Sequence, residues 1–195
     1  MKTRIIVDST SDLMPEIKER VHIVPLTLRF GEEEFIDGVT IDHKRFYEKL
    51  VECDVLPVTS QATPHAFAKE YEKAAKAREC AVVITISSKL SGTYQSAMIA
   101  AEDYENIYVV DSGTGAMGGG ILTELALKLL DEGMDAKSIA EKLEEEKKKI
   151  IIVALVDTLE YLHRGGRISS TVYRIGSIAH IKPIMHVSKE GKAEI

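Results

Sequence analysis

The chain has 195 residues, of which 45% are hydrophobic, so it is long enough to bury a full core in one large domain or one domain with part of another. A formal net charge of −6, with no stripe of Lys and Arg, argues against nucleic acid as a partner. Two cysteines in no metal or disulfide pattern, and no apolar run of membrane-spanning length, predict a cytoplasmic protein without stable membrane insertion.

Short β-rich apolar runs alternate with segments of helical periodicity along most of the chain. The predicted strands, in chain order, are residues 3–8, 22–30, 80–87, 106–111 and 150–157. The predicted helices are a short one at 15–20 and longer ones at about 42–52, 64–76, 92–102, 116–132 and 136–149, with Gly133 as a stop and a hairpin around Gly31. This alternation predicts an α/β fold, a mostly parallel Rossmann-like sheet with helices on both faces.

A charged run, "EKLEEEKKK", changes at Ile150 into the apolar "IIIVALVD". Paired Glu and Lys residues at helical spacing indicate a solvated helix face. We therefore predict an N-terminal α/β domain over residues 1–149 and the start of a second α/β domain, only partly present, over residues 150–195.

Polar residues precede two of the predicted helices at the strand ends, where ligands bind to such sheets. In "TSQATP", Thr63 caps the helix that begins at Pro64, which leaves Thr59, Ser60 and Gln61 unexplained. In "SSKLSGTYQSA", Ser88 or Ser91 can cap a helix. Hydroxyl donors beside a helix N-terminus also form an anion site that needs no basic residue. The cap and the anion site remain alternatives.

A glycine pattern, Gly113, Gly115 and Gly118, fits the GxGxxG of a dinucleotide site between a strand and a helix. The next strand-end acid, Asp157, comes much too late to bind a ribose, and Asp111 puts a negative charge near the turn. We interpret these glycines as a closely packed turn, with a nucleotide-dependent enzyme as the alternative function.

Asp8 and Asp12 follow the first strand and could indicate a metal-dependent enzyme, although Ser11 or Asp12 as a helix cap explains the pattern more simply. In "YLHRGGRISS", Arg167 is either part of a helix C-cap or a donor to a carboxylate or phosphate. The six histidines show no metal-binding spacing, and Ser91 lacks the GxSxG of a serine hydrolase.

Taken together, "VDSTSD", "TSQAT", "SSKLSGTYQSA", "VVDS" and "YLHRGGRI" resemble, in order, the motifs of the DegV family of bacterial fatty-acid-binding proteins, over residues 5–192. The resemblance implies a two-domain α/β protein without catalysis or a cofactor of its own. Such a protein holds one long-chain fatty acid, about C16 to C18, in an apolar tunnel. It presents the carboxylate to a separate fatty acid kinase, which makes acyl-phosphate for phospholipid synthesis.

Carried over by motif, the resemblance assigns the carboxylate-binding hydroxyls to Thr59 and Ser91. Ser60, Gln61 and Gly92 are expected to support them, and Arg167 is expected near the head group or the kinase contact. The family's "TSQPS" reads "TSQAT" here. Family members also continue beyond this length and carry a head-group histidine in the later part, so no histidine of this chain is given that role.

Overall fold

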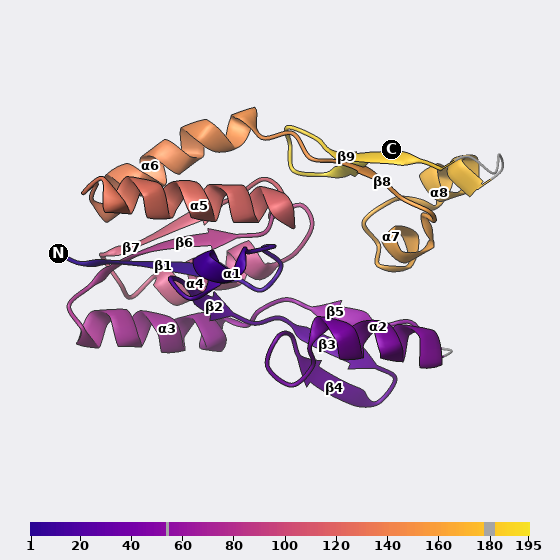
Figure 1. The fold of residues 1–195 in the computed structure, drawn as a ribbon, viewed down its shortest axis with the longest axis horizontal. Coiled ribbons are helices and arrows are strands. Elements are labelled where there is room, and N and C mark those ends of the chain that lie inside the picture. Colours follow the sequence, from indigo (N-terminus) through magenta and orange to yellow (C-terminus); the bar gives the residue numbers. More distant parts are fainter. Residues whose placement is uncertain (54, 178–181) are drawn as a thin grey trace.

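The computed structural model describes residues 1–53, 55–177 and 182–195, which form three sheets with covering helices (Figure 1). The central sheet is parallel, with the strand order β2-β1-β6-β7. Its strands are β1 (Thr3–Asp8), β2 (His22–Val24), β6 (Cys80–Thr85) and β7 (Ile107–Asp111). The predicted parallel sheet is therefore confirmed, with its strand ends at one edge.

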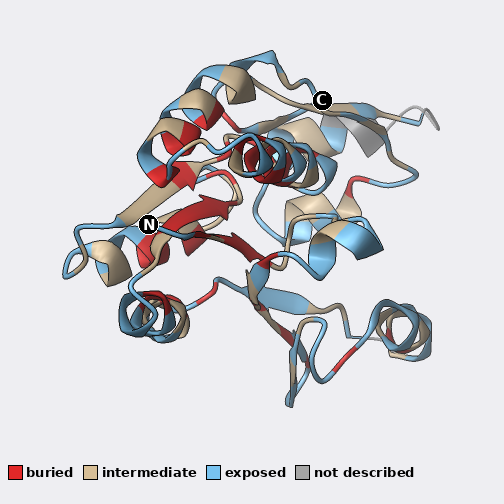
Figure 2. Cartoon of the chain, turned by 60° about the vertical axis from the view of Figure 1, so that its left-hand side comes forward, coloured by how far each residue is buried: buried red, intermediate tan, exposed pale blue. Residues whose placement is uncertain are grey.

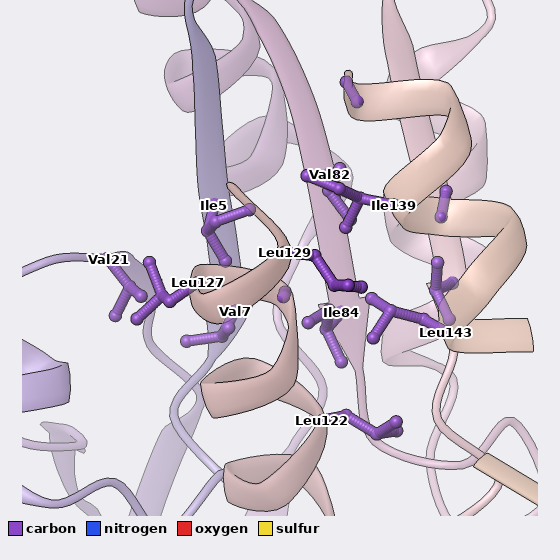
Figure 3. Packing of buried hydrophobic residues seen from close by; sticks show 14 residues of the cluster. Ile5, Val7, Val21, Val82, Ile84, Leu122, Leu127, Leu129, Ile139 and Leu143 are labelled. Atoms are coloured by element: carbon purple, nitrogen blue, oxygen red, sulfur yellow. The ribbon is translucent and has the colours of Figure 1, made fainter. Parts of the chain in front are cut away.

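Helices cover both faces of the central sheet, as predicted. Alternate strand residues point to opposite faces. Ile5 and Val7 pack against α5 (Met117–Asp131) and α6 (Ala136–Glu146), as Figure 3 shows. On the other face, Ile6 belongs to the core formed with α3 (Pro64–Lys76) and α4 (Thr93–Ala101). The centre of this sheet is the most continuously buried part of the chain (Figure 2).

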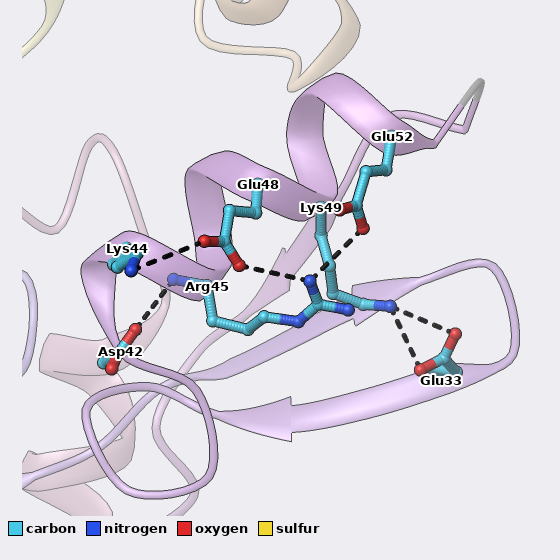
Figure 4. Close-up of polar contacts among 7 residues, drawn as sticks. All are labelled: Glu33, Asp42, Lys44, Arg45, Glu48, Lys49 and Glu52. Carbon is cyan, nitrogen blue, oxygen red and sulfur yellow. Dashed lines mark hydrogen bonds and ion pairs between the residues drawn. The ribbon is translucent and has the colours of Figure 1, made fainter.

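A second, antiparallel sheet of order β4-β3-β5 is inserted between β2 and α3. It contains β3 (Thr27–Phe30), β4 (Glu33–Ile36) and β5 (Val58–Ser60), and α2 (His43–Glu52) lies on it. The predicted hairpin is confirmed, since Gly31 turns between β3 and β4 with φ of +59°. Polar contacts along α2 and from α2 to β4 hold this helix in place (Figure 4).

The third sheet is also antiparallel and has the order β10-β9-β8. After α6, the chain passes through the 3₁₀ turn η1 (Lys147–Lys149). It then forms β8 (Val153–Leu155), α7 (Glu160–Arg164), α8 (Ser170–Ser177), β9 (Ile184–Val187) and β10 (Ala193–Glu194). The chain leaves the helices of the parallel sheet at about residue 150, where we placed the boundary between two domains. The division into two domains stays a prediction.

Two predicted strands differ from the structure. The segment 22–30 is not one strand, because it divides at Pro25 into β2 and β3, which belong to different sheets; proline has no N–H for a ladder. The segment 150–157 does not join the parallel sheet; only Val153–Leu155 is a strand, and it pairs with β9. An apolar run predicts a strand but not its partner, which here comes from about 30 residues later.

The ends of the predicted helices agree with the structure to within about three residues, but two predicted caps are wrong. The short helix α1 (Pro15–Lys18) follows Met14, which makes no side-chain cap bond, so neither Ser11 nor Asp12 caps it. The N-cap of α4 is Gly92 rather than Ser88 or Ser91. Thr63 does cap α3 by accepting a hydrogen bond from the N–H of Ala66. Within the described residues, no helix is long and apolar enough to cross a membrane.

Candidate functional site

A cavity of about 1060 Å³ is lined by both small sheets, by α2 and α7, and by the loops that follow β1 and β6. Its apolar lining residues are Leu26, Phe46, Leu50, Val55, Leu56, Pro57, Val58, Ile86, Leu90, Leu162, Met185, Val187 and Ala193. Its hydrogen-bonding side chains include Thr10, Thr59, Gln61, Ser91 and Arg167. Four residues predicted from three separate motifs therefore line one cavity. A largely apolar lining with a few polar groups suits a mainly apolar ligand.

Ser91 lies in the loop between β6 and α4, directly before the helix. Its Oγ accepts a hydrogen bond from the N–H of Thr93 and lies 2.9 Å from the Thr93 hydroxyl. Thr93 Oγ1 also accepts from the N–H of Ala62, and either hydroxyl can donate in the contact between Ser91 and Thr93. When Thr93 is the donor, the Ser91 hydrogen can donate into the cavity, beside the N-terminus of α4.

Gln61 lies against Gly92, on the other side of the same loop. Its Nε2 donates to Ser96 Oγ at 2.9 Å. A Cβ added to Gly92 would lie 2.0 Å from Gln61 Oε1, so glycine is what allows this approach. Gly92 itself does not line the cavity, and neither does Ser60, which pairs with Thr27 in the small sheet. Gln61 and Gly92 therefore contribute to the packing of the loop that carries Ser91.

Arg167 follows a Schellman motif at the end of α7. Gly166 has a φ of +76°, its N–H donates to the carbonyl of His163, and the N–H of Arg167 donates to that of Leu162. The Arg167 side chain then donates from Nε to the Leu90 carbonyl at 3.1 Å and from Nη1 to the Gly165 carbonyl. Arg167 thus follows a helix C-cap, as one interpretation predicted, and its guanidinium donates to carbonyls beside Ser91. Its expected role toward a carboxylate or phosphate stays a prediction.

Thr10 lines the cavity but was missed by the sequence analysis. Asp8, fully buried at the end of β1, accepts hydrogen bonds from the N–H and hydroxyl of Thr10 and from the N–H of Ile86. Burial raises the pKa of the Asp8 carboxyl, although these hydrogen bonds act in the opposite direction. Asp8 thereby joins two lining residues. The signal available in the sequence was a hydroxyl two residues after a strand-end acid.

The acidic side chains at the ends of β1 and β7 already accept hydrogen bonds. Asp111 accepts hydrogen bonds from the N–H groups of Ser88 and Gly113, while Asp8 is occupied as described. Among residues 1–53, 55–177 and 182–195, no group of three or more His, Cys, Asp or Glu side chains could hold a metal ion. These two acids organise loops at the strand ends.

The glycines after β7 are most closely packed at the start of α5. A Cβ on Gly118 would lie 2.3 Å from Thr114 Oγ1, and one on Gly120 would lie 2.1 Å from the Asp12 carbonyl. The N–H of Asp12 also donates to the Ala116 carbonyl. Gly119 and Gly120 allow α5 to approach the loop after β1. The interpretation of a closely packed turn holds for Gly118, whereas a Cβ on Gly113 would meet no atom of the described residues within 4 Å.

The family model described as "Uncharacterised protein, DegV family COG1307" matches residues 2–195. A DegV domain-containing protein of Halalkalibacterium halodurans is 40% identical over 190 residues, which cover 95% of this chain and 67% of that protein.

Two solved structures with the same fold are described by the ligands they bind. One, described as showing fatty acid binding of a DegV family protein from Thermus thermophilus, is 32% identical with a TM-score of 0.88 and matches 100% of this chain and 70% of its own. The other, a stearic-acid-binding protein from Eubacterium ventriosum, is 29% identical with a TM-score of 0.89 and matches 100% of this chain and 69% of its own.

Proposed function

This chain belongs to the DegV family, and on this basis we propose that it binds one long-chain fatty acid, about C16 to C18, in the cavity of about 1060 Å³. The carboxylate is held by Thr59 and Ser91 and is presented to a separate fatty acid kinase, which forms the acyl-phosphate. The observation that carries the proposal is the meeting of Thr59, Gln61, Ser91 and Arg167 in one largely apolar cavity.

The apolar lining can supply most of the affinity. Burying a methylene contributes about 0.8 kcal/mol, so a tail of about 14 methylenes gives roughly 11 kcal/mol before the costs of association and ordering. The lining side chains of α2, α7 and β9, such as Leu50, Leu162 and Met185, provide the apolar contacts. Such a ligand needs little additional energy from its head group.

Neutral donors suffice for the carboxylate. A carboxylate taken out of water must receive hydrogen bonds, and hydroxyls beside a helix N-terminus provide them. Ser91 has a hydrogen to donate, and Thr59 lies on the lining with an exposed side chain. Arg167 already donates from Nε and Nη1 to two carbonyls, so the fork that would use Nε is not available to the ligand. Hydroxyl donors leave the carboxylate more nucleophilic toward ATP than a tight guanidinium pair would.

This arrangement gives the chain and the kinase different roles. The chain binds and orients the acid without catalysing its phosphorylation, and the kinase reaches the carboxylate near Arg167. Residues 1–149 form the unit that carries Thr59 and Ser91, while residues 150–195 begin the unit that covers the tail. Two unpaired cysteines, Cys53 and Cys80, fit a cytoplasmic location.

The direct test is mass spectrometry of an organic extract of the purified protein, followed by thermal unfolding with added ligands. We expect a stoichiometric C16 to C18 acid, and a melting temperature that rises with fatty acid concentration by mass action. NAD, ATP and Mg²⁺ should leave it unchanged. A protein that is purified empty and does not rebind fatty acid would refute the proposal.

Site variants test the head group separately. Ser91→Ala should weaken fatty acid binding by about tenfold, the value of one hydrogen bond to a charged group, and should slow phosphorylation by the kinase. Ser60→Ala is the matched control, because Ser60 lies one residue from Thr59 but does not line the cavity. If Ser91→Ala kept full affinity and full phosphorylation, the assignment of Ser91 would be wrong.

A further inference from the structure

Ser87 is a buried hydroxyl outside the proposed binding residues, at the start of the loop that carries Ser91. It is 1% exposed. Its carbonyl accepts the N–H groups of Leu90 and Ser91, at 2.9 and 3.1 Å, so it sets the turn that places Ser91. Its N–H donates to the Thr114 carbonyl at 2.8 Å, and its Oγ accepts from the N–H of Lys89 at 3.2 Å. The main chain of Ser87 is thus built into the carboxylate loop.

The hydroxyl of Ser87 reaches across 104 residues to the turn between β9 and β10. It donates to the Gly191 carbonyl at 2.7 Å. Gly191 is buried and has a φ of +80°, and a Cβ placed there would lie 2.3 Å from Ser87 Oγ. The N–H of Gly191 donates to the Ser188 carbonyl, which closes the turn. Only glycine lets the turn come this close to the loop.

A second contact joins the same loop to the C-terminal part of the chain. Arg167 Nε donates to the Leu90 carbonyl, at the other end of the turn that begins at Ser87. Residues beyond 150 therefore hold the loop at both ends, at Ser87 and at Leu90. Because loops with few fixed contacts sample many conformations, these two contacts restrict where the Ser91 hydroxyl can lie.

We propose that Ser87 is a positioning residue for the carboxylate site, whose hydroxyl couples the β9–β10 turn to the loop that carries Ser91. This inference rests on the proposed fatty acid binding. It assigns the C-terminal unit a second role besides covering the tail: it orders the head-group donors. Loss of the Ser87 hydroxyl should then affect recognition of the carboxylate and leave the apolar contacts unchanged.

The test compares two ligands with the same tail, palmitate and 1-hexadecanol, by their rates of dissociation into phosphatidylcholine vesicles. In Ser87→Ala we expect palmitate to dissociate about tenfold faster and hexadecanol to change by less than about twofold. Ser88→Ala is the control, because Ser88 contacts Asp111 through its main-chain N–H. A general loss of structure would accelerate both ligands equally.

Two further measurements separate coupling from simple destabilisation. Gly191→Ala forces the turn away from Ser87, so it should reproduce the Ser87→Ala phenotype, and the two changes together should not add. Hydrogen exchange of the Leu90 and Ser91 amides, measured without ligand, should be faster in both variants. Ser87→Cys, which keeps a weak donor of similar size, should recover part of the palmitate selectivity.

The outcomes distinguish this inference from the proposed function. A wild-type protein that binds neither ligand would overturn the proposed function and the role of Ser87 with it. A wild type that prefers palmitate, with unchanged selectivity in Ser87→Ala, would overturn the role of Ser87 alone. Unchanged exchange at Leu90 and Ser91 would also overturn it.

Discussion

Lys49 and Glu33 form an ion pair (Figure 4), and we predict that replacing Glu33 lowers the free energy of unfolding more than replacing Lys49. Lys49 on α2 is 6% exposed, and its Nζ lies 3.2 and 3.1 Å from the two carboxylate oxygens of Glu33. The Glu33 side chain is 65% exposed. Lys49 Nζ also lies 5.8 and 5.3 Å from the ring centres of Phe30 and Phe35. The more exposed partner therefore neutralises a buried charge.

Glu33→Gln should cost about 1–2 kcal/mol of unfolding free energy, because it leaves a buried ammonium without its carboxylate. Breaking a fully buried pair costs about 3–5 kcal/mol, and water at the exposed Glu33 side replaces part of the loss. Lys49→Met should change stability by less than about 1 kcal/mol, since it removes the desolvated charge and keeps an apolar chain against the rings. The buried residue is thus predicted to be the more tolerant one.

The assay is urea unfolding of both single variants and the double variant, with the exposed neighbour Glu34→Gln as control. In the Lys49→Met background, Glu33→Gln should cost almost nothing, since no ammonium remains to be neutralised. High salt should narrow the difference between the single variants, because Glu33 faces solvent. A larger cost for Lys49→Met than for Glu33→Gln would refute the reasoning. Since α2 also carries lining residues, Glu33→Gln should weaken fatty acid retention as well.

Two other predictions concern a helix cap and acid stability. Asp135→Ala should lower stability in thermal or urea unfolding, because Asp135 caps α6 by accepting a hydrogen bond from the N–H of Ser138. Asp135→Asn keeps an acceptor oxygen and should restore most of the loss. The pKa of Glu79 is lowered in the folded protein, chiefly by the hydrogen bond from Arg4. Ionised Glu79 therefore contributes fully to the free energy of unfolding above its ordinary pKa of 4.5, and this contribution is lost as the pH falls through the lowered pKa. Glu79→Gln should therefore lose less stability than the wild type between about pH 5 and pH 3. If the melting temperatures of the two proteins fell equally over this pH range, the prediction would be wrong.

Local patterns were sufficient for most of the secondary structure and for the composition of the site. The start signal at Thr63 and Pro64 is confirmed, because a cap acts within a few residues of its own chain. Thr59 could be singled out because the cap at Thr63 left it unexplained, whereas Ser91 and Arg167 each kept a structural alternative as part of a helix cap. Family resemblance then gave them a shared role that their spacing alone does not contain.

Pairing and packing between distant segments decided the rest. The apolar run at 150–157 predicts a strand, but only the fold shows that Val153–Leu155 pairs with β9 and leaves the parallel sheet. Thr10 was not recognised as a lining residue, because its hydroxyl motif shows a hydrogen bond to Asp8 but not which cavity the loop borders. The Ser87–Gly191 contact spans 104 residues. Short-range rules depend on neighbours along the chain, whereas a cavity and its supports depend on which remote surfaces bury each other, and this is settled only when the whole core packs.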